Sequence, residues 1–124
     1  MNINFIKHYN ADIKNLLNNI DPNDLKKTIR LIKNVKKNNS KIILAGNGGS
    51  AALSSHVAVD FTKAVGIRAI NFNEADLITC FANDYGYKNW LYQALKSYSK
   101  KKDLVILVSS SGQSLNMLNA AKYC

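Results

Sequence analysis

Cysteine is scarce in this 124-residue sequence, which contains only Cys80 and Cys124. Their spacing matches neither a metal-binding motif nor a disulfide framework, so we expect free thiols in a reducing cytoplasm. No apolar stretch approaches the roughly 20 residues of a membrane-spanning helix, so we expect no membrane association. Residues 1–20 mix polar and apolar side chains throughout, unlike a signal peptide. These absences predict a cytoplasmic protein.

Linkers, low-complexity segments and tandem repeats are also missing from the chain. Its length suits one domain with a substantial core. We expect a single domain over residues 1–124. It would have a helical part over about 1–38 and an α/β part over about 41–124.

Acidic residues are few, since eight Asp and Glu stand against 17 Lys and Arg, for a formal net charge of +9. A basic protein can bind nucleic acid, an anionic membrane or an acidic small molecule. Here the lysines concentrate at 34–41 and 99–103, directly before apolar runs, where they would follow helix C-termini and complement the dipole. Aromatic residues do not interleave with them as a base-stacking surface requires. We therefore predict solvated helix ends and no nucleic-acid partner.

The first 38 residues show the apolar spacing of two helices. Asp21 and Pro22 interrupt the pattern and predict the start of the second helix, with Asp21 as N-cap and Pro22 at the first position. The inward stripe of this second helix is expected to consist of Leu25, Ile29, Ile32 and Val35.

Short apolar runs and helical patterns alternate after residue 40. Strands are predicted at 41–45, 67–72 and 104–108. Helices are predicted at 50–65, with Leu53 and Ala58 on its apolar face, and at 74–82, 87–99 and 114–124. Apolar strands that alternate with helices indicate a parallel sheet covered on both faces. Because the last pattern reaches Cys124 without a C-cap glycine, we expect the front part of a longer domain, or a chain that depends on a partner.

The segment AGNGGSAALSSH, residues 45–56, joins a predicted strand to a predicted helix, and its first five residues hold half of the six glycines. Backbone N–H groups and the dipole at such a helix start bind anions. Ser50 would cap the helix, donate its hydroxyl to a ligand, or do both. By itself the loop also fits the dinucleotide fingerprint Gly46-x-Gly48-x-x-Ala51, with Glu74 as ribose acid. It equally fits a tight turn that holds no ligand.

The segment SSSGQS, residues 109–114, again lies between a predicted strand and a predicted helix. A dinucleotide does not need four serines there, whereas a phosphate accepts several hydrogen bonds from hydroxyls and helix N-terminal amides. Both loops are expected at the carboxyl ends of parallel strands. Together they predict a compact phosphorylated ligand.

The order GNGGS, a helix with SSH, NDYGY and SSSGQS resembles the sugar isomerase (SIS) domain. Within that family the chain is most similar to the phosphoheptose isomerases, which convert sedoheptulose 7-phosphate to glycero-manno-heptose 7-phosphate. The resemblance implies a three-layer α-β-α, flavodoxin-like fold and isomerisation through an enediolate in bacterial heptose, lipopolysaccharide or capsule biosynthesis. It also implies a homotetramer with shared active sites, and zinc in some members.

The resemblance further implies roles for residues of both loops and of NDYGY. The phosphate would be held by Ser109, Ser110, Ser111 and Ser114. The sugar chain and part of the phosphate would be held by Asn47, Gly48, Gly49 and Ser50. Sugar hydroxyls would contact Asn83 and Asp84, for which the simpler interpretation is a turn.

His56 and Asp60 are spaced i, i+4 and share one helix face. Such a pair suits acid–base chemistry, two metal ligands or a surface hydrogen bond. By resemblance, His56 matches the family's histidine, and Asp60 takes the place of its glutamate, the base and in some members a zinc ligand. Aspartate is shorter by roughly 1.5 Å, and a misplacement near 1 Å can cost about a hundredfold in rate. The family's C-terminal glutamine and histidine have no counterpart in these residues, and His8 is not expected to replace them.

Three hypotheses follow from these residues. The leading one is a phosphoheptose isomerase-type enzyme with Asp60 as base. The second is a non-catalytic sugar-phosphate sensor or partner subunit, and the third is a nucleotide-binding oxidoreductase fold.

Overall fold

The computed structural model of the chain describes residues 3–124, which form two compact units, one ending at Leu31 and one over Ile32–Cys124. The first unit contains α1 (Ile3–Asn18) and the beginning of α2 (Pro22–Lys37). The Asp21 carboxylate accepts the N–H of Asn23 at 2.8 Å, which confirms Asp21 as N-cap. Within residues 3–124 no helix is long and apolar enough to span a bilayer.

The predicted inward stripe of α2 is only half correct. Val35 is 2% exposed, and Ile32 packs against the same core cluster. Leu25 and Ile29, in contrast, are 52% and 51% exposed, so their predicted burial is wrong. Helical spacing puts apolar side chains on one face, but burial also needs an element against that face.

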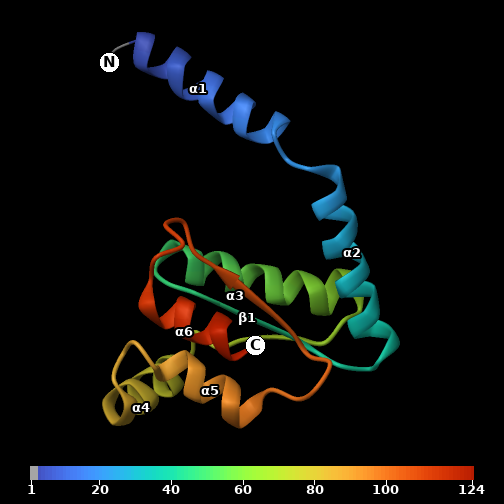
Figure 1. The fold of residues 1–124 in the computed structure, drawn as a ribbon, viewed down its shortest axis with the longest axis vertical. Helices are drawn as coiled ribbons and strands as arrows, with labels where there is room; N and C mark the ends of the chain where they lie inside the picture. The colour runs from blue at the N-terminus through green and yellow to red at the C-terminus, as the bar shows by residue number, and fades with distance from the viewer. Residues whose placement is uncertain (1–2) are drawn as a thin grey trace. The chain divides into compact units, whose positions relative to one another are not determined.

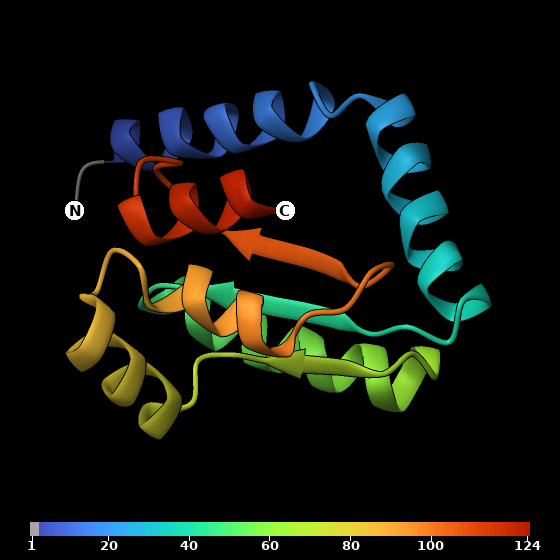
Figure 2. The same cartoon turned by 60° about the horizontal axis from the view of Figure 1, so that its bottom comes forward.

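Three parallel strands form the centre of the second unit, in the order β2-β1-β3 (Figures 1 and 2). They are β1 (Ile42–Gly46), β2 (Ala69–Asn71) and β3 (Leu104–Val108). The central strand β1 is buried along its whole length. Its apolar sequence IILAG is what a strand buried on both faces requires, and the predicted parallel sheet is confirmed.

Helices cover both faces of this sheet. They are α3 (Gly49–Asp60) with a π-helical extension (Phe61–Val65), α4 (Ala75–Tyr85), α5 (Trp90–Tyr98) and α6 (Leu115–Tyr123). Ile42 and Leu44 pack with Ala58 of α3 on one face, whereas Ile43 and Ala45 pack with α5 and α6 on the other. Figure 1 shows α3 on one side of β1 and α5 and α6 on the opposite side. The three-layer, flavodoxin-like architecture is therefore confirmed.

The face that α3 turns to the sheet is only partly the predicted one. Ala58 is buried against the sheet as expected, but Leu53 is 52% exposed and Ser54 is fully buried. The Ser54 hydroxyl donates to the Ser50 carbonyl at 2.8 Å, which satisfies the buried oxygen within the helix. The end of the helix follows the prediction, since Gly66 closes it in the left-handed region at φ 66°.

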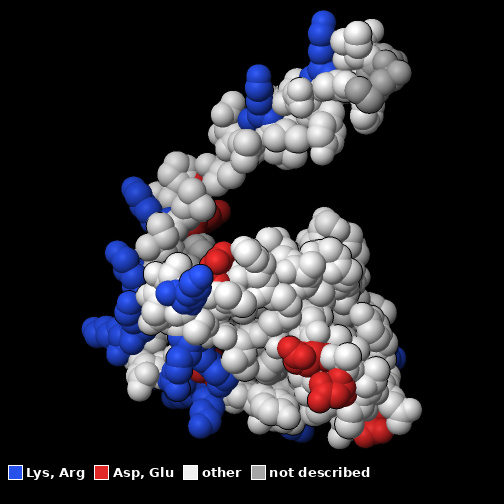
Figure 3. All heavy atoms as spheres, turned by 180° about the vertical axis from the view of Figure 1, so that it is seen from behind, with Lys and Arg blue, Asp and Glu red and all other residues white. Residues whose placement is uncertain are grey.

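Basic side chains gather where α2 ends and the strands begin (Figure 3). Lys36 Nζ donates to the Val65 carbonyl at 3.0 Å, and Lys41 Nζ donates to the carbonyl of Tyr98, the last residue of α5, at 3.1 Å. Ammonium groups thus bind the free carbonyls of helix ends, where the dipole favours positive charge. The predicted position of these lysines at helix ends is confirmed.

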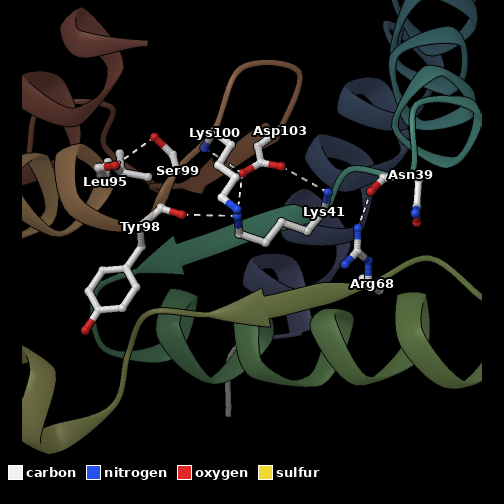
Figure 4. Close-up of polar contacts among 8 residues, drawn as sticks. All are labelled: Asn39, Lys41, Arg68, Leu95, Tyr98, Ser99, Lys100 and Asp103. Carbon is white, nitrogen blue, oxygen red and sulfur yellow. Dashed lines mark hydrogen bonds and ion pairs between the residues drawn. The ribbon is translucent and has the colours of Figure 1, made fainter.

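Asp103 organises the same edge of the sheet (Figure 4). Its side chain is 5% exposed and accepts hydrogen bonds from Lys41 Nζ at 2.5 Å, from the Lys100 N–H at 2.8 Å and from the Lys41 N–H at 3.1 Å. Burial raises the pKa of Asp103, but these hydrogen bonds and the Lys41 charge outweigh burial and lower the pKa below its ordinary value. The ionised carboxylate therefore ties the start of β1 to the start of β3.

Candidate functional site

The two loops predicted to bind a phosphorylated ligand begin side by side. Gly46 at the end of β1 is paired in register with Val108 at the end of β3. The following residues, Asn47 and Ser109, therefore leave the sheet at the same carboxyl edge. Figure 1 shows the β3–α6 connection and the start of α3 on this side of the sheet. The edge is the usual ligand site of parallel α/β sheets.

Glycine shapes the first loop at two positions. A Cβ on Gly46 would lie 2.5 Å from the carbonyl carbon of Ser50, so only glycine fits between β1 and α3. Gly48 is the N-cap residue of α3 at φ 54°, a left-handed conformation that glycine adopts without strain. The helix begins at Gly49 without a side-chain cap among the described residues, so the expected capping role of Ser50 is wrong. Its role in ligand binding stays a prediction.

Asn73, which follows β2, holds the backbone of this loop. Its Oδ1 accepts the Gly46 N–H at 3.0 Å, and its Nδ2 donates to the Gly46 carbonyl at 2.7 Å. The Asn73 N–H is itself bonded to Asn71 Oδ1 at 3.2 Å. The sequence prediction missed Asn73. The signal available was an asparagine directly after the strand predicted next to the glycine loop.

Three segments meet at the side chain of Asn47. Asn47 and Asn116 exchange two amide hydrogen bonds of 3.0 and 2.9 Å, and the Tyr87 hydroxyl donates to Asn47 Oδ1 at 3.1 Å. Asn116 lies in the first turn of α6 and is 3% exposed. Tyr87 is the last residue of the NDYGY motif and lies between α4 and α5. Neither residue was predicted for the site, although Tyr87 lies inside a motif and Asn116 is the second residue after SSSGQS.

The serine loop uses two hydroxyls to shape its own backbone. Ser109 Oγ accepts the Gly112 N–H at 3.1 Å, and Ser111 Oγ accepts the Gln113 N–H at 3.2 Å. A hydroxyl that accepts one hydrogen bond keeps its O–H for a further acceptor. Ser114 is the N-cap residue of α6 and makes no side-chain cap bond within residues 3–124, while Ser110 is exposed. Four hydroxyls and a helix N-terminus thus lie within six residues, as a phosphate site requires.

Asn83 and Asp84 lie in the last turns of α4, because that helix continues to Tyr85. The interpretation of this pair as a turn is therefore wrong, and the chain reverses at Gly86, at φ 76°. Asn83 Nδ2 donates to Asp84 Oδ1 at 3.0 Å, and both residues are exposed. Among the described side chains, Tyr87 rather than this pair reaches the glycine loop.

His56 and Asp60 form the expected pair on one face of α3. His56 Nε2 lies 3.5 Å from Asp60 Oδ2, and the two side chains are 78% and 59% exposed. They lie on the solvent side of the helix, away from the buried Ser54 and Ala58. No bond within the described part of the chain links them to either loop. The pair is open to a ligand or to another molecule.

Zinc would need more than this pair. Protein zinc sites use at least three protein ligands, and His56 with Asp60 supplies two. Among residues 3–124 no group of three His, Cys, Asp or Glu side chains lies close enough to hold a metal ion. The pair alone does not fit a zinc site, and we derive no step through a metal.

Comparison with known proteins agrees with this geometry. The SIS domain family model matches residues 8–124. Phosphoheptose isomerase 2 of Campylobacter jejuni is 38% identical over 109 residues, which cover 77% of this chain and 54% of the relative. Phosphoheptose isomerase of Helicobacter pylori strain 26695 is 35% identical over 102 residues, covering 77% of this chain and 53% of the relative. The chain thus spans about half the length of these relatives.

Solved structures show the same fold. Phosphoheptose isomerase from Neisseria gonorrhoeae superposes with a TM-score of 0.85 at 26% identity, over 97% of this chain and 66% of that protein. The enzyme from Francisella tularensis gives the same TM-score at 20% identity, over 98% of this chain and 66% of that protein, a likeness of fold alone. The parallel sheet, the paired loops and the match over residues 8–124 agree, and the chain belongs to the SIS domain family.

Proposed function

We propose that this chain is the sugar-phosphate-binding part of a phosphoheptose isomerase, acting on sedoheptulose 7-phosphate. The register of Gly46 with Val108 carries the proposal, because it brings the glycine loop and the serine loop to one edge of the sheet. The serine loop offers hydroxyls and the α6 N-terminus to the phosphate. The glycine loop offers Asn47, the backbone of Gly48 and Gly49, and the Ser50 hydroxyl to the sugar. Relatives named phosphoheptose isomerase support this substrate.

The proposed reaction moves a carbonyl from C2 to C1 of the sugar. A carboxylate base takes a proton from C1, which gives an enediolate, and returns it to C2 while the hydroxyl proton passes from O1 to O2. Asp60 is the proposed base, with His56 beside it at 3.5 Å to exchange the proton between the oxygens. Hydrogen-bond donors around the enediolate stabilise its negative charge.

The distance between the loops and the base favours a shared site. His56 lies about six residues after the glycine loop, roughly 9 Å along the helix axis. Together with its exposure on the outer face of α3, this separation favours a neighbouring copy that completes the site. We therefore propose a homo-oligomer, a tetramer as the family resemblance implies. We further propose that it works in the cytoplasm in bacterial heptose, lipopolysaccharide or capsule biosynthesis.

Titration with sedoheptulose 7-phosphate tests the proposed ligand. We expect NMR amide shifts at 47–50 and at 109–114 together, and smaller shifts elsewhere. Shifts at neither loop in a folded sample overturn the proposal. The proposed chemistry is tested on the complete protein, where Asp60→Ala should abolish turnover while the sugar phosphate still binds.

A non-catalytic sugar-phosphate sensor is the second candidate. The observation that favours it is an aspartate in place of the glutamate of the resembling enzymes, on an exposed helix face that no loop residue contacts in the described part of the chain. A sensor would bind the sugar phosphate without turnover. It would also change its affinity for another protein when the ligand is present.

A further inference from the structure

The Asn47 amide has most of its hydrogen-bonding capacity already used. Its Oδ1 accepts two hydrogen bonds, from Asn116 Nδ2 at 2.9 Å and from the Tyr87 hydroxyl at 3.1 Å. Its Nδ2 donates one, to Asn116 Oδ1 at 3.0 Å. A primary amide has two acceptor lone pairs and two N–H donors. The carbonyl is therefore saturated, and one N–H of Asn47 is left to donate.

We propose that Asn116 and Tyr87 are positioning residues, which hold the Asn47 amide so that its remaining N–H donates to an oxygen of the bound sugar phosphate. This inference rests on the proposed function, in which Asn47 contacts the sugar chain. The group that meets Asn47 must then be an acceptor, such as a hydroxyl lone pair, an enediolate oxygen or a phosphate oxygen. A ligand donor finds no free lone pair on Asn47.

Further hydrogen bonds and burial hold Asn116, Tyr87 and Asn47 in place. Asn116 is 3% exposed at the start of α6, and Asn119 one turn later donates to the Lys88 carbonyl at 2.9 Å. Tyr87 and Lys88, which are adjacent in the chain, are thereby bonded to Asn47 and to α6, respectively. Asn73 holds the backbone of Gly46, immediately before Asn47. Asn116 thus holds the Asn47 side chain, Asn73 holds the backbone of the preceding residue, and the ligand meets a donor that is already oriented.

A double-mutant cycle distinguishes positioning from general support of the fold. Asn116→Leu removes both bonds to Asn47, and we expect about a tenfold weaker Kd for sedoheptulose 7-phosphate. In an Asn47→Ala background the same change should have no further effect, because Asn116 acts through Asn47. Additive losses overturn the proposal. Inorganic phosphate, bound by the serine loop, should keep its affinity within about twofold.

Tyr87→Phe is the second variant, and it removes one hydroxyl from an exposed ring. We expect about a threefold to fivefold weaker Kd for the sugar phosphate, again absent in the Asn47→Ala background. An unchanged Kd overturns the part assigned to Tyr87. This variant keeps the proposal testable if Asn116→Leu does not fold.

The Asn47 side-chain NH₂ signals separate this proposal from the proposed function. In the ligand-free protein, Asn116→Leu should shift them and speed their exchange with water. Unchanged signals overturn the positioning role, whatever the ligand does. If Asn116→Leu gives the expected signal changes but the wild-type protein binds no sedoheptulose 7-phosphate, the proposed function is overturned and, with it, the substrate contact.

Discussion

Gly46 and Ser50 approach each other so closely that a Cβ on Gly46 would lie 2.5 Å from both the carbonyl carbon and the carbonyl oxygen of Ser50. The contact joins the end of β1 to the first turn of α3. It lets the chain enter the helix directly after the central strand of the sheet. The candidate ligand loop therefore has a backbone that only one residue type permits at its first position.

Gly46→Ala should lower the free energy of unfolding by about 1–3 kcal/mol, because backbone atoms rather than a flexible side chain must move. Gly49→Ala is the matched control, since a Cβ there meets nothing within 4 Å. Alanine also favours the helical conformation at that position. Urea denaturation of both variants provides the measurement. Equal losses in the two would show that the Gly46 contact has no special cost.

Asn73→Ala should lower the free energy of unfolding by about 2 kcal/mol, because the buried backbone of Gly46 loses both partners. Asn73→Asp should not restore stability, since a carboxylate cannot donate to the Gly46 carbonyl. Asn10→Ala, at an exposed position of α1, is the control and should change stability by less than about 0.5 kcal/mol. Chemical denaturation followed by circular dichroism measures all three. A stable Asn73→Ala variant would contradict the role given to Asn73.

Asp103→Asn should make the free energy of unfolding depend less on pH in the acidic range. The pKa of Asp103 is lowered on folding, so its ionised form stabilises the protein above the ordinary value of 3.8, and that contribution is lost as the pH falls through the folded pKa. At pH 7 we expect the variant to be less stable by about 1–3 kcal/mol. Below about pH 4 the difference should shrink. Thermal unfolding between pH 2.5 and 7 gives the two curves, and parallel curves would refute the linkage.

If the proposed isomerase activity is correct, Asp60→Glu should raise turnover by up to about a hundredfold, because the longer side chain brings the carboxylate closer to the sugar. Asp60→Asn should remove turnover, since an amide does not accept the proton. Steady-state kinetics with sedoheptulose 7-phosphate measures both. A slower Asp60→Glu variant would show that the aspartate is itself the fitted base.

The layered fold was predictable because its signals are local. The run LVILV predicts β3 over the residues that form it, and Gly66 ends the helix after β1 at the expected residue. Helix boundaries without such a signal were less accurate. The helix α4 continues through Asn83 and Asp84 because nothing in those residues stops it before Gly86. Exposed Leu53 and buried Ser54 show that packing, not polarity alone, selects the inward face.

The sequence by itself determined that a glycine-rich loop and a serine-rich loop follow parallel strands, because glycine, serine and strand signals act over a few residues. Only the tertiary structure decided what holds those loops. Asn47 and Asn116 are 69 residues apart in the chain, and Gly46 and Asn73 are 27 residues apart. These pairs meet because β1 lies between β2 and β3 in one register. Hydrogen bonds between distant segments depend on that register, and no local pattern encodes it.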